Sequence, residues 1–205
     1  ERLERYIEAY IKFRMAEQVD DIKPAAGHAR QADGLRAWLK GLEAIPRDGL
    51  TLDQDIDYRL IRSGILTDIA RIERERKWER DPGIYIAYSG IESLVAAGDM
   101  APEERERRLL QAFEKVPAAI AAAKANLTHP PRFLFDQAAG TLKNALAYYR
   151  KEVRQCLKGG PAGTAGLNRA YEKALAALEE YQRYLEHDLG PRADGSLGIG
   201  RDLYD

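Results

Sequence analysis

Apolar side chains recur every three or four residues along most of this chain, and this spacing constrains the fold more than any other feature. In an α-helix of 3.6 residues per turn, such spacing places the apolar side chains on one face. Short alternating runs flanked by Asn-Gly or Asp-Gly turns, which mark β-hairpins, are missing. The sequence therefore predicts an all-α fold of about seven stacked amphipathic helices.

Capping residues and prolines divide this pattern into helices. Thr51 with Gln54 three residues later has the spacing of a capping box, in which each side chain satisfies a backbone N–H of the first helical turn. Pro117 interrupts an apolar stripe, which predicts a kink or two abutting helices there. The expected helices cover about residues 3–19, 35–44, 51 to the charged run at 71–80, 83–97, 102–127, 133–157 and 167–187.

The ends of these helices suggest how the chain is organised. Residues 159–166 are rich in glycine and alanine and contain a proline, so we expect an exposed loop. A new element begins at about Gly200, just where the sequence stops at Asp205. We therefore expect residues 1–205 to be the N-terminal helical region of a larger protein.

Composition argues against two classes of partner. Lys and Arg total 32 and Asp and Glu total 33, so the net charge of -1 gives no general attraction to nucleic acid. Every apolar stretch is broken by charge well before the roughly 20 residues that a membrane span needs. We expect a soluble protein, either cytoplasmic or exported after removal of a signal peptide, and the sequence does not decide between these compartments.

No residue is assigned a catalytic or metal-binding role. His28, His129 and His187 are scattered, and none has the spacing of a zinc-binding helix. Cys156 is the only cysteine, and an apolar packing role is preferred over a nucleophile. The alternating aspartates at 53–57 resemble the start of a calcium loop but are better explained as acids in a first helical turn.

The segment after Trp78 carries the one candidate binding surface. On the expected helix 83–97, Tyr85, Tyr88 and Glu92 follow one another at i, i+3 and i+7 beneath an Asp81 cap. Tyrosine tips beside a carboxylate suit a polar cleft, so these four residues are candidate cleft-lining residues. The alternative is an inter-helix contact in which the hydroxyls are satisfied internally.

A resemblance to a known family rests on several segments in order. Residues 108–120, continuing through 125–131, resemble a signature of the bacterial "domain of unknown function 885" family. Residues 55–66 look like an early long helix of that family, Asp81-Pro82 with Tyr85 looks like its next element, and 181–204 looks like the passage into its second half.

This resemblance implies a helical protein similar to zinc metallopeptidases, in which a His-Glu-x-x-His helix supplies two ligands and a general base. That motif is absent from residues 1–205. The resemblance places the metal site in the continuation of the chain, so no cofactor is expected in these residues, although zinc is expected in the parent protein. The chain would then be the N-terminal half, with the remainder of its own chain as partner and a small peptide as substrate.

Two functions follow. The preferred hypothesis is a helical scaffold that forms one wall of the substrate cleft of a zinc-dependent peptidase or amide hydrolase, the chain alone having no activity. The alternative is a non-catalytic helical module for protein interaction or ligand binding. Under the first hypothesis we also expect unusually exposed apolar surface, or self-association, in residues 1–205 by themselves.

Overall fold

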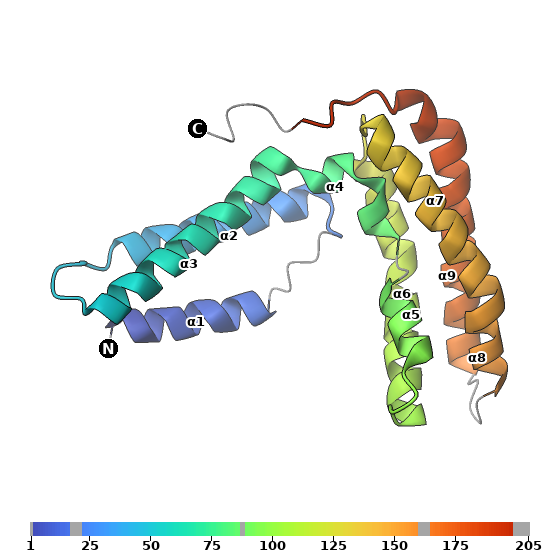
Figure 1. Cartoon of the computed structure of the whole chain (residues 1–205), viewed down its shortest axis with the longest axis horizontal. Coiled ribbons are helices and arrows are strands. Elements are labelled where there is room, and N and C mark those ends of the chain that lie inside the picture. The colour runs from blue at the N-terminus through green and yellow to red at the C-terminus, as the bar shows by residue number, and fades with distance from the viewer. Residues whose placement is uncertain (1, 17–21, 87–88, 160–164, 199–205) are drawn as a thin grey trace. The chain divides into compact units, whose positions relative to one another are not determined.

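The computed structural model describes residues 2–16, 22–86, 89–159 and 165–198. Within these ranges every regular element is helical, and the β-type contact is an isolated bridge between Pro131 and Gly195 (Figure 1). The prediction of an all-α fold of stacked helices is confirmed.

The described residues form two compact units, each with its own apolar core. Unit 1 is residues 2–77 and unit 2 is Trp78–Gly198. No buried apolar side chain is shared between the two core clusters of the described residues. The structure thus divides the single helical region that the sequence predicts into two units, which we describe separately.

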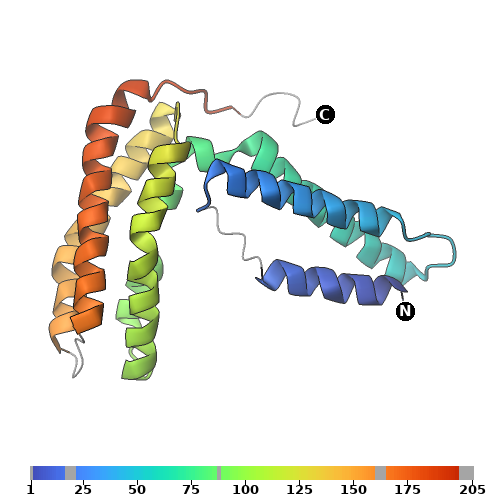
Figure 2. The same cartoon turned by 180° about the vertical axis from the view of Figure 1, so that it is seen from behind.

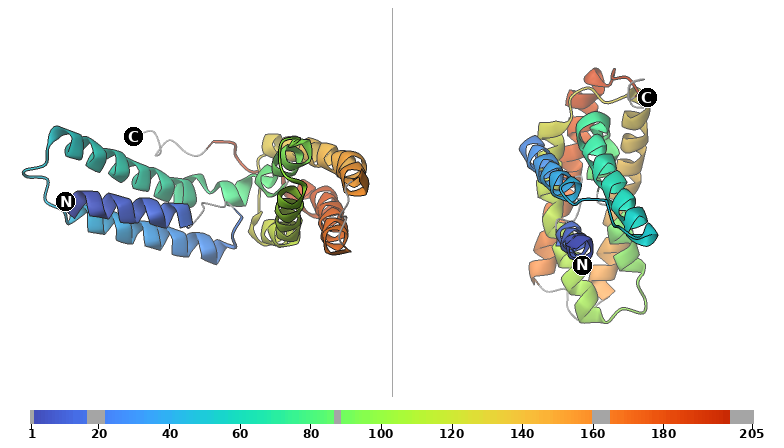
Figure 3. Two further views of the ribbon diagram at one scale, coloured as in Figure 1. Left: turned by 90° about the horizontal axis from the view of Figure 1, so that it is seen from below. Right: turned by 90° about the vertical axis from the view of Figure 1, so that its left-hand side faces the viewer.

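Unit 1 consists of three main helices that lie side by side (Figure 3). They are α1 (Arg2–Ala16), α2 (Ala25–Glu43) and α3 (Leu52–Ala70), which continues into the π-helical turn η1 (Arg71–Glu75). A short helix, α4 (Lys77–Arg80), follows after Arg76, whose φ of 46° breaks the helical path.

Aromatic side chains join α1 to α2. The rings of Tyr6, Tyr10 and Phe13 lie with their centroids 5.1, 5.6 and 5.4 Å from the ring of Trp38. The hydroxyl of Tyr6 donates a hydrogen bond to the Trp38 carbonyl. A Cβ at Gly41 would lie 2.7 Å from that hydroxyl oxygen, so a glycine is needed for α1 to approach this closely.

The start of α2 differs from the prediction. We expect a helix over 35–44, whereas α2 begins at Ala25, directly after Pro24. The buried face of its first half carries His28 and Gln31 among its apolar residues, so the apolar spacing is interrupted and the helix cannot be recognised from periodicity alone.

The capping box at the start of α3 is confirmed. The Thr51 hydroxyl accepts from the Gln54 N–H at 3.3 Å, and the Thr51 N–H donates to the Gln54 side chain at 3.1 Å. Further along, Asp68 is almost fully buried and forms an ion pair with Arg14 of α1 at 2.7 Å. The capping box stabilises the start of α3, and the ion pair joins its later part to α1.

Unit 2 is larger and contains the longest described helix, α6 (Figure 2). In chain order its elements are the 3₁₀ turn η2 (Pro82–Tyr85), α5 (Ser89–Ala96), α6 (Pro102–Asn126), α7 (Arg132–Tyr148), the π-helical turn η3 (Tyr149–Val153), α8 (Arg154–Gly159), α9 (Ala165–Tyr184), the π-helical turn η4 (Leu185–Leu189) and the 3₁₀ turn η5 (Gly190–Arg192). Helices α6 and α9 pack along each other, as Figure 2 shows.

Small residues allow this close packing of α6 and α9. Alanines lie on the buried face of both helices, and helices with such faces approach closely. At one end of the contact, Phe113 lies 6.0 Å from the ring of Tyr149 and 5.8 Å from that of Tyr171. The Tyr171 hydroxyl donates to the Tyr149 carbonyl at 2.9 Å, so a polar group in this core is satisfied.

Pro117 lies inside α6, which runs unbroken from Pro102 to Asn126. Of the two alternatives, the structure therefore excludes abutting helices. The ring removes one helical hydrogen bond, and alanines that favour helix follow it immediately, so the helix continues.

The predicted loop 159–166 falls mostly outside the described residues, since 160–164 are not among them. Gly159 ends α8, whereas residues 165 and 166 already belong to α9. Residues 17–19 of the first expected helix also lie outside the described part of the chain.

Candidate functional site

The prediction of one continuous helix over residues 83–97 is wrong. Asp81 caps only a short turn, since its carboxylate accepts from the Gly83 N–H at 2.8 Å and Pro82 follows as the first residue of η2. Ile86 then adopts an extended conformation, and α5 begins at Ser89. Gly83 favours this break because glycine is a poor helix former.

Because of this break, Tyr85 and Glu92 lie on separate elements and do not share a helix face. Glu92 is exposed on α5, and Asp81 is half-buried at its cap. Tyr88 lies outside the described residues. The role of the four residues in lining a cleft stays a prediction.

Tyr85 itself is fully buried. Its hydroxyl donates to the Trp78 carbonyl and accepts from the Asn126 side-chain amide at 3.0 Å. This arrangement corresponds to the alternative in which the hydroxyl is satisfied internally. It also uses Asn126, which is just 4% exposed.

Tyr181 of α9 also contacts this turn. Its hydroxyl donates to the Pro82 carbonyl at 2.8 Å, and burial raises the pKa of Tyr181 well above the ordinary tyrosine value. Tyr181 therefore stays protonated and acts as a hydrogen-bond donor. The Asp81–Tyr85 turn is a structural junction between α6 and α9.

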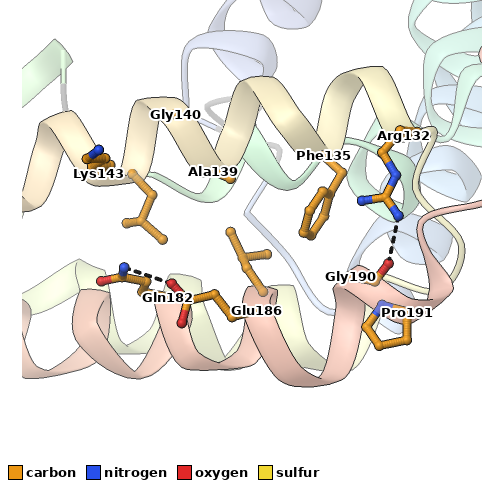
Figure 4. A pocket seen from close by; sticks show the side chains of 11 residues that line it. Arg132, Phe135, Ala139, Gly140, Lys143, Gln182, Glu186, Gly190 and Pro191 are labelled. Atoms are coloured by element: carbon orange, nitrogen blue, oxygen red, sulfur yellow. Dashed lines mark hydrogen bonds between the residues drawn. The ribbon is translucent and has the colours of Figure 1, made fainter.

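A hollow in unit 2 lies elsewhere, between α7 and the helix formed by α9 and η4 (Figure 4). It is an open groove with a volume of about 640 Å³. Phe135, Leu142 and Leu185 form its apolar floor, and Ala139 and Gly140 keep one wall low. A Cβ at Gly140 would meet nothing within 4 Å, so this wall is open.

Charged side chains border the groove. Arg132 donates to the Gly190 carbonyl at 3.2 Å and lies 5.2 Å from the Phe135 ring centre. Lys143 is exposed and forms no ion pair with a described residue. On the opposite wall, Gln182 donates to Glu186 at 2.9 Å. The groove thus offers an apolar floor with a cation near each end of the α7 wall (Figure 4).

Close backbone packing shapes the end of the groove. A Cβ at Gly190 would lie 3.0 Å from the Leu185 carbonyl oxygen and 3.3 Å from the Phe135 ring. Glycine is therefore required for η5 to pass beside α7. Gly190 follows the helix that the sequence predicts over residues 167–187, and only the tertiary contact reveals this role.

The charged residues of the groove lining are Arg132, Lys143 and Glu186. Its lining residues include no histidine or cysteine and only one carboxylate, Glu186. General acid–base chemistry and nucleophilic attack most often use groups of these kinds, although lysine also serves in both. An elongated ligand with an apolar body and an anionic group fits the floor and the cations of α7.

Several hydrogen bonds hold the segment that follows η5 in place. Gly195 N–H donates to the Pro130 carbonyl at 3.2 Å, and His129 Nδ1 lies 2.8 Å from Asp194 Oδ1. Arg80 donates to the carbonyls of two later residues, Ser196 and Gly198. A Cβ at Gly195 would lie 1.9 Å from the His129 carbonyl oxygen, so no other residue fits without a shift.

Within the described ranges, no three His, Cys, Asp or Glu residues gather closely enough to hold a metal ion. No helix in that part of the chain is both long and apolar enough to cross a membrane.

Comparisons with known proteins agree with the sequence resemblance. The family described as "Bacterial protein of unknown function (DUF885)" matches residues 7–205. No curated protein matches the chain. A solved structure from Shewanella oneidensis, of a protein of unknown function thought to be a lipoprotein, has the same fold with a TM-score of 0.83 at 21% identity. The match covers 98% of this chain and 41% of that one, so the chain spans about two-fifths of the relative's length.

Proposed function

Because the chain belongs to the bacterial family of unknown function DUF885, we propose that it is the helical scaffold of a longer hydrolase similar to zinc metallopeptidases. The observation that carries this proposal is the fold match, in which nearly the whole chain corresponds to two-fifths of a longer protein. Its residues would form one wall of a substrate cleft, as the N-terminal half of the longer protein.

The zinc ion of this proposal would be held outside residues 1–205. The described residues do not fit it, because no cluster of three ligands is present among them. We therefore derive no step of the reaction through zinc for this chain. In proteins of this kind the metal activates water and polarises the bond to be cleaved.

Within this proposal, the groove between α7 and α9 is the cleft wall. Its floor is formed by Phe135, Leu142 and Leu185, which are all at least nine-tenths buried and are therefore fixed in position. A fixed wall orients a bound peptide before any reaction. Lys143 would attract the terminal carboxylate of a short peptide whose apolar side chains lie on the floor.

Two measurements on the longer protein test this function. The gene should encode a His-Glu-x-x-His helix after Asp205, and the purified protein should contain one zinc ion per chain and hydrolyse short peptides. Lys143→Ala should raise KM about fivefold with little change in kcat, because an exposed ion pair contributes at most about 1 kcal/mol to binding. Lys158→Ala, an exposed lysine on α8, is the matched control.

A protein without the motif, or without bound metal and hydrolysis, would rule out the hydrolase. The alternative is a non-catalytic ligand-binding module, which the groove favours because acid–base pairs are missing from its lining. In that case Lys143→Ala would weaken binding of an anionic, apolar ligand by a similar factor while no substrate is turned over.

A further inference from the structure

Helix α3 is apolar on two opposite faces. Tyr58, Ile65 and the later Ile72 are buried in the core of unit 1. On the opposite face, Leu52, Ile56 and Leu60 follow one another at intervals of four residues and are 76, 46 and 64% exposed. This spacing aligns them in one stripe, which we call the outer stripe of α3.

A helix that is apolar on both faces is normally covered on both. Single exposed apolar residues are common, but a row of them on one helix is a typical interaction surface. Among the described residues, seven of the nine large exposed hydrophobic residues belong to unit 1, although unit 1 is the smaller unit. The uncovered surface is therefore concentrated on one part of the molecule.

A hollow of about 570 Å³ lies beside the outer stripe. It is lined by Arg47, Tyr58, Arg59, Arg62, Ser63 and Leu66. The arginines at its rim are already paired within unit 1: Arg59 lies 2.6 Å from Asp55, and Arg62 lies 2.9 Å from Glu43. This side of the stripe can receive an apolar side chain without leaving an arginine unpaired.

The other side of the stripe is acidic. Neither Asp53 nor Asp57 forms an ion pair with a described residue. Asp53 also lies in the first turn, where the helix dipole favours an acid. A partner helix that covers the stripe would therefore complement it best with aliphatic residues at its centre and Lys or Arg along the edge that faces these aspartates.

We infer that the outer stripe of α3 is the surface on which an aliphatic helix from the rest of the longer protein packs. The occupant follows from length, since more than half of the solved relative lies outside the region that matches this chain. The inference rests on the scaffold role in the proposed function and is independent of the zinc chemistry.

Photo-crosslinking of the longer protein tests it. With p-benzoylphenylalanine in place of Leu60, illumination should link position 60 to residues of the same chain beyond Asp205, as identified by peptide mass spectrometry. The same group at Asp48, an exposed residue in the turn before α3, should give at least a tenfold lower yield of these links. Crosslinked dimers, links to residues 78–198, or no links from position 60 would overturn the assignment.

A second variant removes the dependence on crosslinking yield. Leu60→Lys should lower the Tm of the longer protein by several degrees because it places a charge in a covered apolar contact. Phe133→Lys, at a residue that is 57% exposed on α7, is the control and should leave the Tm unchanged. An unchanged Tm for Leu60→Lys would contradict the inference. Loss of zinc or of hydrolysis would not affect either readout, so failure of the hydrolase proposal is distinguishable.

Discussion

The two units differ in where the polar contacts between their helices lie. In unit 2, buried tyrosine hydroxyls donate to backbone carbonyls: Tyr85 to Trp78, Tyr171 to Tyr149 and Tyr181 to Pro82. In unit 1, the half-buried Tyr6 makes one such bond to Trp38, and other links between helices are ion pairs at the surface, such as Arg36 with Glu73 and Arg62 with Glu43. Exposed ion pairs contribute little, whereas satisfied groups in a large core hold helices in one arrangement. This contrast agrees with the proposal that a further part of the longer protein packs on unit 1.

The largest expected effect comes from the aromatic cluster of unit 2. Phe113→Ala removes a fully buried ring that contacts two tyrosines and should lower the free energy of unfolding by about 3–5 kcal/mol. Phe13→Ala in unit 1 is the matched change, and it should cost about half as much because Phe13 is only partly buried. Urea unfolding followed by circular dichroism measures both. Equal losses would contradict the contrast between the two cores.

The ion pair between Arg14 and Asp68 is the exception in unit 1, because Asp68 is buried. Arg14→Ala leaves that carboxylate without its close partner and should cost about 2–3 kcal/mol. Asp68→Ala should cost less, about 1 kcal/mol, because Arg14 is 38% exposed and can be hydrated. The same unfolding experiment gives both values. A larger loss of unfolding free energy for Asp68→Ala than for Arg14→Ala would contradict this prediction.

Loss of the Tyr85 hydroxyl should have the next smaller effect on the free energy of unfolding. Tyr85→Phe removes the bond to the Trp78 carbonyl and the acceptor for Asn126, and should cost about 1–2 kcal/mol. Tyr85→Phe combined with Tyr88→Phe also tests the cleft prediction. Unchanged activity and ligand affinity in the intact protein would remove these tyrosines from the candidate site.

The smallest effect concerns pH. A hydrogen bond from His129 lowers the pKa of Asp194 below its ordinary value of 3.8. A carboxyl with a lowered folded-state pKa stabilises the fold above its unfolded pKa, and this contribution is lost as the pH falls through the folded value. Asp194→Asn should therefore lower the Tm slightly at neutral pH and make no difference in strong acid. A difference in Tm between the variant and the unmodified protein that increases as the pH falls would contradict this prediction.

The sequence predicts those parts of the fold that depend on local signals. The capping box at Thr51 forms as expected, and the Asp81-Pro82 cap forms but begins only a 3₁₀ turn. The start of α2 is missed because His28 and Gln31 occupy positions on its buried face. Polar residues in a core face hide its periodicity.

The site is harder to predict because its residues meet only after folding. The groove brings residues 132–143 together with residues 182–191, and neither segment carries a motif. Tyr85 and Asn126 likewise form a contact across 41 positions of the sequence. Spacing within one helix predicts which residues share a face, but the break at Ile86 separates Tyr85 from Glu92.

Gly195 has no side chain, and this provides a test that can be applied to related sequences. Since even a methyl group there would collide with the His129 carbonyl, any homologue whose backbone follows this path must have glycine at the equivalent position. A related sequence with a larger residue at that point is expected to have a displaced connection after η5. The residue aligned with Gly195 thus distinguishes relatives whose backbone follows this path from relatives in which the connection after η5 differs.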